Sequence, residues 1–447
     1  MDTKVAPDSV ATGRARTPQR PSTQPSLSAP RCAAIAFAIF VSTHVALLIG
    51  LSAPEKFVFD ELHYVPAARQ MLGLMPATPQ LNPMHPPLAK ELIALSIRSF
   101  GDNAFAWRYP RTLFGALAVV AIYLCGLTLF AAQAPALAAA LIAVFNQMLY
   151  VQARTAMLDI YALALSLLAI AAFLHGYRRR SPQAAFALAG AGFGLAAACK
   201  WSGAFPLVAV LGIVALVRLL QHWRTSFAEP REDDWYRPEL WANLKSYQIA
   251  LCFLVIPAAC YFATFIPLYG PSVADILEAQ RRIFADNITT AIAGHTYMSA
   301  WPSWPLLLRP VWFLFDKTDD QHIAAVVFLG NPVALWPALL ALLVCVRDVV
   351  MARRAEPFLI VAFYLGCYLP WALLPRALSF LYYYLPSATL ASLALPYALA
   401  KSRRYWALWL YVALVAAGFV AMLPISAAFV GTSMQTFNRL MLFQSWI

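Results

Sequence analysis

The sequence contains few charged residues: only 12% of its 447 residues are Asp, Glu, Lys or Arg, whereas 61% are apolar. A soluble domain has about a quarter charged and about half apolar residues, so this composition excludes a water-soluble fold. Cysteine is also scarce, and none of the seven cysteines forms a CxxC pair or another metal-ligand spacing. The sequence therefore predicts neither a metal site nor a disulfide framework. The cysteines are interpreted as small apolar side chains.

The net charge of +12 does not indicate a nucleic-acid partner in so apolar a chain. In a membrane protein, Lys and Arg gather in the cytoplasmic loops. Residues 1–31 are rich in Pro, Ser, Thr and Arg and are predicted to form a disordered cytoplasmic tail. The apolar run that follows lacks a small-residue cleavage pattern, so we interpret it as a retained first helix and not as a signal peptide.

Apolar runs able to cross a bilayer, at roughly 20 residues per crossing, recur eleven times along the chain. They lie at residues 32–51, 111–131, 135–152, 156–177, 183–200, 203–221, 247–268, 333–347, 357–375, 379–399 and 405–424. The sequence thus predicts an all-α integral membrane protein, in which residues 32–447 form a single transmembrane domain.

Basic residues fix the predicted orientation. They cluster before the first run and after the fourth, sixth, eighth and tenth runs, as Arg14, Arg16, Arg20, Arg31, Arg178, Arg179, Arg180, Arg224, Arg231, Arg237, Lys245, Arg347, Arg353, Arg354, Lys401, Arg403 and Arg404. A cytoplasmic N-terminus places every cluster in the cytoplasm and the C-terminus outside. Two large loops, residues 52–110 and 269–332, then lie on the extracytoplasmic side. The second contains an amphipathic stretch at 276–286, typical of a helix in the membrane interface.

The first outer loop carries two motifs whose side chains are candidates for catalysis or binding. Asp60 and Glu61 are adjacent carboxylates, which either offset the dipole of an interfacial helix or provide a base that takes a proton from an acceptor hydroxyl. Further on, His85-Pro86-Pro87 precedes Lys90. This lysine either extends toward lipid headgroups or holds a phosphate as a point charge. The residues alone leave both alternatives open.

Further polar residues fall on the same membrane face. Arg154 and Asp159 flank the start of an apolar helix, where unpaired charges are costly, so they form either a structural ion pair or part of a site. Lys200 ends the next helix on that face. His295 and Tyr383 add aromatic groups, although interfacial aromatics are common in any membrane protein. Carboxylates, cations and aromatics therefore converge on the extracytoplasmic face.

In order along the chain, these motifs resemble those of the protein O-mannosyltransferases and their bacterial relatives, polyprenyl-phosphate-dependent glycosyltransferases of the GT-C fold. The resemblance is carried by Asp60-Glu61, His85 through Lys90, Arg154 through Asp159, Lys200-Trp201, Trp301 through Pro310, Gly330-Asn331-Pro332 and Arg376 through Pro386. It implies inverting transfer of a sugar, usually mannose, from a polyprenyl or dolichyl phosphate to a Ser or Thr hydroxyl of a protein. It also implies that no metal or other cofactor is obligatory.

The resemblance assigns roles to individual residues. Asp60 becomes the catalytic base, Glu61 its neighbour at the acceptor and Asp159 a second acidic group. The residues predicted to bind the substrate and the carrier phosphate are His85, Lys90, Arg154, Lys200, His295, Arg376 and Tyr383. Two positions depart from the family pattern: Pro83-Met84 stands where an acid often precedes His-Pro-Pro, and Tyr383 stands where His is frequent. The second outer loop is also too short to hold the luminal β-trefoil of the eukaryotic enzymes, which favours a bacterial-type member.

The expected protein is therefore a multi-pass enzyme of a bacterial inner membrane, with a cytoplasmic N-terminus and a periplasmic active site and C-terminus. Its expected partners are a polyprenyl-phosphate-linked sugar, a protein acceptor and the bilayer. A rival interpretation is transfer of an amino sugar to lipid A, but such relatives typically add a C-terminal periplasmic domain and only about 23 residues follow the last run. A lipid-linked sugar transporter would place its ionisable residues near mid-membrane, and an internal repeat typical of transporters is not found.

Overall fold

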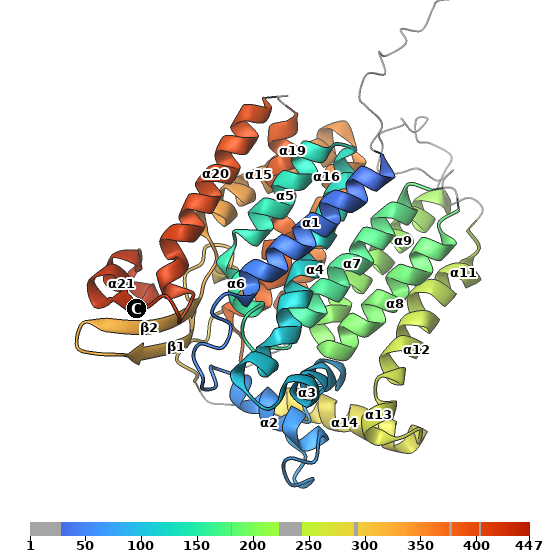
Figure 1. The fold of residues 1–447 in the computed structure, drawn as a ribbon. Helices are drawn as coiled ribbons and strands as arrows, with labels where there is room; N and C mark the ends of the chain where they lie inside the picture. Colours follow the sequence, from blue (N-terminus) through green and yellow to red (C-terminus); the bar gives the residue numbers. More distant parts are fainter. Residues whose placement is uncertain (1–27, 180, 223–243, 290–293, 375–377, 402–403) are drawn as a thin grey trace, which may run out of the picture.

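The computed structural model describes residues 28–179, 181–222, 244–289, 294–374, 378–401 and 404–447, and its long helices run side by side as a bundle (Figure 1). Within these residues, eight helical segments are long and apolar enough to cross a membrane. They are α1 (Ala29–Leu48), α4 (Ala104–Phe130), α7 (Asp159–Tyr177), η1 with α9 (Trp201–Ala204 and Phe205–His222), α11 through α12 (Ser246–Ala263), α15 (Pro332–Ala352), α16 with α17 (Ala355–Tyr368 and Pro370–Leu373) and α20 (Tyr405–Met422).

The other three predicted runs are helical but shorter or interrupted. Residues 135–152 form α5 (Gln133–Val144) and α6 (Gln147–Gln152), which are separated because the Asn146 side chain accepts the Met148 N–H and starts a new helix. Residues 183–200 form α8 (Gln183–Cys199). Residues 379–399 form a 3₁₀ turn, η4 (Leu381–Tyr384), and two short helices, α18 (Leu385–Ala391) and α19 (Ala394–Ala400). The helical character of all eleven runs is therefore confirmed, whereas eleven complete crossings stay a prediction.

Two predicted boundaries are wrong. Helix α1 begins at Ala29, inside the expected tail, of which residues 1–27 lie outside the described part of the chain. Helix α4 begins at Ala104, because the Asn103 side chain caps it by accepting the Ala106 N–H at 3.0 Å. The helix therefore starts seven residues before the predicted apolar run at 111–131. The first two turns of α4 contain polar residues, so a search for apolar runs does not include them.

Short helices cover the end of the bundle that holds the outer loops. They are α2 (Glu61–Met71), α3 (Leu88–Phe100), α13 (Ile266–Tyr269) and α14 (Val273–Thr289), and in Figure 1 α14 lies across the bundle below α12. Helix α14 buries Ile276 and Ile283 against the bundle and exposes Arg281 and Arg282. This is the amphipathic helix that the sequence predicted.

A small antiparallel sheet was not predicted. It has the order β1-β2-β3, formed by β1 (Val311–Lys317), β2 (His322–Phe328) and β3 (Thr432–Ser433), and α21 (Met434–Leu440) follows it. Strands β1 and β2 pair from Val311 with Phe328 to Lys317 with Ile323, with an irregularity that leaves Phe313 unpaired. Both strands are nearly continuous apolar runs, so they lack the alternation that reveals a half-buried strand.

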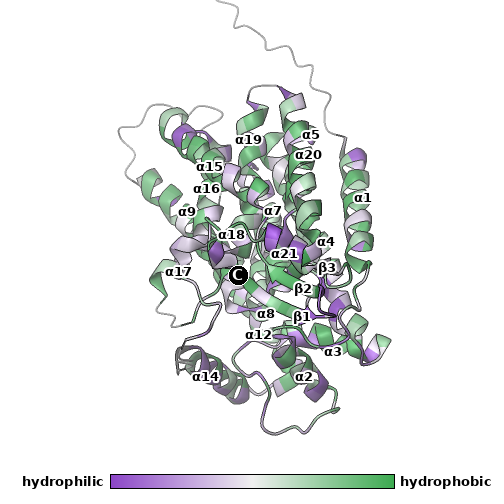
Figure 2. Ribbon diagram, turned by 90° about the vertical axis from the view of Figure 1, so that its left-hand side faces the viewer, coloured by the Kyte–Doolittle hydropathy of each residue, from purple (hydrophilic) through white to green (hydrophobic). Residues whose placement is uncertain are grey.

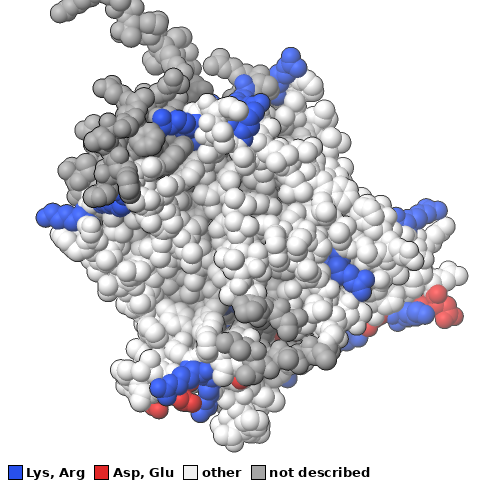
Figure 3. All heavy atoms as spheres, turned by 180° about the vertical axis from the view of Figure 1, so that it is seen from behind, with Lys and Arg blue, Asp and Glu red and all other residues white. Residues whose placement is uncertain are grey.

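The charged residues of the described chain are distributed unevenly between the two ends of the bundle. Figure 2 shows apolar helices between the two ends of the bundle. Among the described residues visible in Figure 3, the upper end shows Lys and Arg without Asp or Glu, whereas the lower end carries both signs. An excess of Lys and Arg at one end is typical of the cytoplasmic side.

Candidate active site

Two helix ends bring the first pair of site residues together. Asp159 is the first residue of α7, and Lys200 is the residue that caps the C-terminus of α8. Lys200 Nζ lies 2.8 Å from Asp159 Oδ1 and 2.9 Å from Oδ2, and both side chains are buried. The alternative prediction of an Arg154–Asp159 ion pair is therefore wrong, because the partner of Asp159 is Lys200.

Asp60 lies beside this pair. It is the residue that precedes α2, and Tyr64, one turn further on, donates a hydrogen bond from Oη to Asp60 Oδ2 at 3.2 Å. Burial raises the pKa of Asp60; the nearby Lys200 ammonium opposes this shift, and the Asp159 carboxylate adds to it. Burial also holds the pKa of Tyr64 well above its usual range, so Tyr64 stays a hydrogen-bond donor. Asp60 is thus a carboxylate with an increased affinity for a proton.

Two tyrosine rings lie next to the Lys200 ammonium. Its Nζ lies 5.1 Å from the centre of the Tyr382 ring and 5.3 Å from that of Tyr383, within cation–π range. Tyr383 is itself fixed by stacking on Trp371 with ring centres 4.2 Å apart. A cavity of about 20 Å³, roughly the space of one water molecule, is bounded by Asp159, Tyr382 and Tyr383.

Glu61 does not face this cluster as a free carboxylate. It is fully buried and receives hydrogen bonds from Arg108 Nε and Nη2, both at 2.8 Å, and from the backbone N–H groups of Val58 and Ala156 at 3.0 and 2.6 Å. Arg108 also donates to the carbonyls of residues 51, 54 and 56. This network ties the segment before Asp60 to α4 and to the segment before Asp159. The place of Glu61 at the acceptor stays a prediction; in the structure its carboxylate is held by Arg108 and by backbone N–H groups.

Lys90 is buried within the first outer loop. Its Nζ donates to the carbonyl oxygens of Asn82 and His85 at 2.7 and 2.8 Å, and only 2% of the residue is exposed. The alternative that Lys90 extends toward headgroups is therefore wrong. Burial lowers its pKa to about 7. The His85 ring lies 5.9 Å from that of Tyr64, which places this loop next to α2, the helix that follows Asp60.

The remaining predicted residues are distributed differently. The guanidinium of Arg154 donates to the Leu47 carbonyl and lies 5.1 Å from the rings of Tyr150 and Phe429. Within the described residues, Arg154 forms neither an ion pair nor a hydrogen bond with Asp60 or Asp159. The His295 ring, in contrast, lies 5.0 Å from that of Phe380 and 6.4 Å from that of Phe59, close to the cluster. Arg376 lies outside the described residues.

Two residues near the site, Phe59 and Arg108, were not predicted from the sequence. Phe59 adopts a left-handed backbone, with φ at 46°, immediately before Asp60. Its ring stacks on Phe313, the residue of the β1 irregularity, with centres 4.5 Å apart and planes 5° apart. Such irregularities often redirect a side chain next to an active site. Arg108 was missed too, although a buried arginine at the start of an apolar helix is itself a signal of function or of a tight ion pair.

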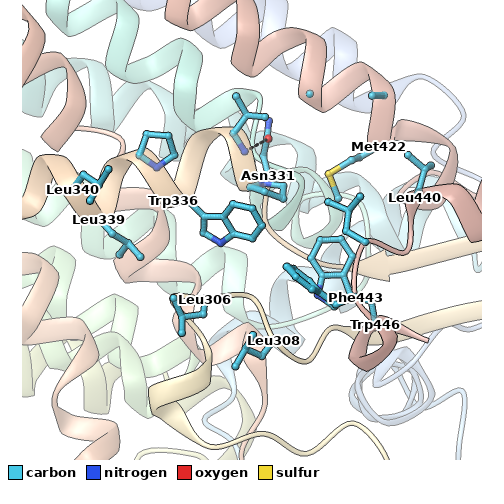
Figure 4. Close-up of a pocket in the computed structure, with 16 residues that line it drawn as sticks. Leu306, Leu308, Asn331, Trp336, Leu339, Leu340, Met422, Leu440, Phe443 and Trp446 are labelled. Carbon is cyan, nitrogen blue, oxygen red and sulfur yellow. Dashed lines mark hydrogen bonds between the residues drawn. The ribbon is translucent and has the colours of Figure 1, made fainter.

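Two further features concern metal binding and a large groove. Within the described residues, no group of three or more His, Cys, Asp or Glu side chains is arranged to hold a metal ion. An apolar groove of about 860 Å³ is lined by residues of α15, α20 and the C-terminal segment, including Trp336, Met422 and Phe443 (Figure 4). Neither Asp60 nor Asp159 lines this groove, so it is separate from the cluster described above.

Two protein-family models match most of the chain. The family model described as dolichyl-phosphate-mannose-protein mannosyltransferase matches residues 37–268, and the C-terminal four-transmembrane region of protein O-mannosyltransferase matches residues 272–446. The chain is similar to the polyprenol-phosphate-mannose–protein mannosyltransferases of Mycolicibacterium smegmatis (27% identity over 386 residues, 73% of each chain) and Corynebacterium glutamicum (26% over 491 residues, 91% of this chain and 92% of that one).

Solved structures share the fold. A structure of the Saccharomyces cerevisiae protein O-mannosyltransferase Pmt1-Pmt2 complex has a TM-score of 0.71, with 14% identity over 93% of each chain. The structure of ArnT from Cupriavidus metallidurans has a TM-score of 0.58, with 14% identity over 88% of this chain and 65% of that one. The fold and the site define a multi-pass membrane glycosyltransferase of the GT-C class. Within that class, the chain belongs to the dolichyl-phosphate-mannose-protein mannosyltransferase family.

Proposed function

We propose that this enzyme transfers mannose from a polyprenyl phosphate to a Ser or Thr hydroxyl of a protein on the extracytoplasmic side of the membrane. The observation that carries the proposal is the position of Asp60, whose pKa is raised by burial, next to the buried Lys200–Asp159 pair. The matched bacterial relatives, whose names give mannose as the sugar and a protein as the acceptor, support the choice of substrates.

The chemistry requires one proton transfer and one displacement. Asp60 accepts the proton of the acceptor hydroxyl, and the hydroxyl oxygen forms a bond to C1 of the sugar. The bond between C1 and the phosphate oxygen breaks as the polyprenyl phosphate leaves with the electron pair. Because the oxygen attacks from the face opposite the leaving phosphate, the configuration at C1 inverts. A general base in this role typically contributes roughly 10²–10⁴-fold to the rate.

The leaving phosphate needs cations, and we propose one from the cluster, Lys200, and one from the first outer loop, Lys90. Lys200 lies next to Asp60 and within cation–π range of Tyr382 and Tyr383, so we assign to it the stabilisation of the negative charge that develops on the leaving phosphate. Lys90 is proposed as a second contact with the carrier. Arg376 keeps the phosphate role that the family resemblance implies. That resemblance is also the ground for proposing that no metal or other cofactor is required, in which case EDTA leaves transfer unchanged.

Transfer to a protein can be separated from transfer to lipid A in one experiment. Purified enzyme is given polyprenyl-phosphate mannose with either a Ser/Thr-rich peptide or lipid A, and mass spectrometry follows the mass of each acceptor. The proposal predicts a peptide heavier by one hexose and unmodified lipid A. Modification of lipid A alone would replace the proposal by its rival. Analysis of periplasmic proteins and lipid A from a deletion strain applies the same test in the cell.

We also propose that the enzyme lies in a bacterial inner membrane, with its N-terminus in the cytoplasm and its active site and C-terminus in the periplasm. The gathering of Lys and Arg at the end of the bundle opposite α14 supports this orientation. A reporter fused after Ile447 should be active only in the periplasm, and one fused before Met1 only in the cytoplasm. Activity of both fusions in the same compartment would contradict an odd number of crossings.

A further inference from the structure

A groove of about 1,070 Å³ lies on the outside of the helix bundle, at the opposite end from Asp60. It is lined by α4, α7 and α8 and by one residue of α1, helices that lie side by side at the front of Figure 1. Small side chains are part of its lining: Ala169 and Ala172 on α7 and Ala191 and Gly192 on α8. Leucines of α4, α7 and α8 also line it. We propose that this groove binds one anionic phospholipid of the cytoplasmic leaflet.

The length of the groove matches the lipid of a single leaflet. Along α7 its lining runs from Leu165 to Arg178, which is roughly 20 Å at 1.5 Å per residue. Along α8 it runs from Ala184 to Leu195, or roughly 16 Å. One leaflet contributes about half of the roughly 30 Å hydrocarbon core. The acyl chains of one phospholipid therefore fill the groove, whereas a chain that crosses the whole membrane would extend beyond it.

The mouth of the groove is polar and cationic. His175, Arg178, Arg179 and Ser181 all line it at the C-terminal end of α7 and the start of α8. Arg178 Nη2 is bound to Glu356 Oε1 at 2.8 Å, which offsets part of its charge. Arg179 is exposed, and within the described part of the chain its guanidinium makes no ion pair. A guanidinium is suited to the oxygens of a phosphate, and the net positive charge favours a headgroup with a net negative charge.

The chain's own N-terminal segment is a poorer occupant. Residues 1–27 contain four basic and two acidic side chains, so they would bring positive charge to a cationic mouth. A lipid with a negative headgroup and two acyl chains complements both parts of the groove. This inference rests on the proposed orientation of the chain and does not depend on the sugar or on the acceptor.

Native mass spectrometry of the full-length protein tests the inference directly. The detergent-purified protein is titrated with phosphatidylglycerol or with phosphatidylcholine of the same acyl chains. One phosphatidylglycerol should be retained in preference to phosphatidylcholine, and Arg179→Gln should reduce this preference about fivefold, the effect of one basic residue near a lipid headgroup. Arg404→Gln, which removes a basic residue that does not line the groove, should leave it unchanged.

Filling the groove separates this site from general adsorption of lipid. Ala172→Phe should abolish retention of both lipids. Ala184→Trp, at an exposed position of the lining, should do the same without disturbing internal packing. Equal retention by the wild type and by Ala184→Trp would overturn the proposal, as would a preference that survives Arg179→Gln. Lipid uptake by a variant that lacks residues 1–27, with none by the full-length protein, would overturn the proposal and show that the chain itself occupies the groove.

Discussion

Lys200 contacts both carboxylate oxygens of Asp159, at 2.8 and 2.9 Å, at the point where α8 ends and α7 begins. Both side chains are buried, and the charges of both act on the carboxyl group of Asp60. The pair therefore does two things: it keeps two buried charges neutral as a unit, and it sets the electrostatic surroundings of the proposed base. Mutations that treat the two partners separately and together can distinguish these roles.

We expect Lys200→Met to reduce both stability and turnover. Removing one partner of a buried ion pair costs about 3–5 kcal/mol, because the other charge is left uncompensated. The double substitution Lys200→Met/Asp159→Leu removes both charges and should recover most of that stability. Turnover should stay low in the double variant, since the leaving phosphate still lacks its cation. Thermal unfolding and transfer to a peptide are measured side by side. Recovery of turnover in the double variant would reduce the pair to a structural element.

The pH dependence should reveal the raised pKa of Asp60. The base acts only when deprotonated, so kcat/KM should fall as the pH drops through the pKa of Asp60 in the folded enzyme. Burial raises this pKa. The acid limb, the part of the pH profile in which kcat/KM falls, should therefore lie above the ordinary aspartate pKa of about 3.9. The hydrogen bond from Tyr64 lowers the pKa of Asp60, so Tyr64→Phe should move the limb to still higher pH. A limb in the same position in both enzymes would mean that another group controls it.

Lys90 should make donor binding sensitive to pH near neutrality. Burial lowers its pKa to about 7, so its ammonium is charged below this pH and becomes a neutral amine above it. If its charge holds the carrier phosphate, the apparent KM for the lipid donor should rise in the wild type as the pH increases through about 7. Lys90→Arg cannot lose its charge, and its KM should stay flat over this interval. If the apparent KM of the wild type does not change with pH, Lys90 does not bind the carrier phosphate and serves only to hold the Asn82 and His85 carbonyls.

The sequence predicted the helical fold and most of the cluster for one physical reason. Apolar runs and charges at their ends are local signals, so Asp60, Asp159 and Lys200 could be assigned to the same membrane face without knowledge of packing. Which charges pair depends on how the helices pack, and the sequence therefore left open the partner of Asp159. The bond between Glu61 and Arg108 joins residues 47 positions apart, and the stack of Phe59 on Phe313 requires an unpaired strand residue. Neither relationship has a local signature.

The central claim is that Asp60 is the base, and the most direct measurement is turnover of purified Asp60→Asn enzyme with saturating donor and peptide. Asn keeps the shape and removes the basicity, so turnover should fall by at least about 100-fold while the unfolding temperature and donor binding persist. Glu61→Gln is the matched comparison: it disrupts the bond to Arg108 and should lower the unfolding temperature as well as turnover. Asp60→Asn enzyme that keeps more than about a tenth of wild-type turnover, well short of a general-base effect, would contradict the account.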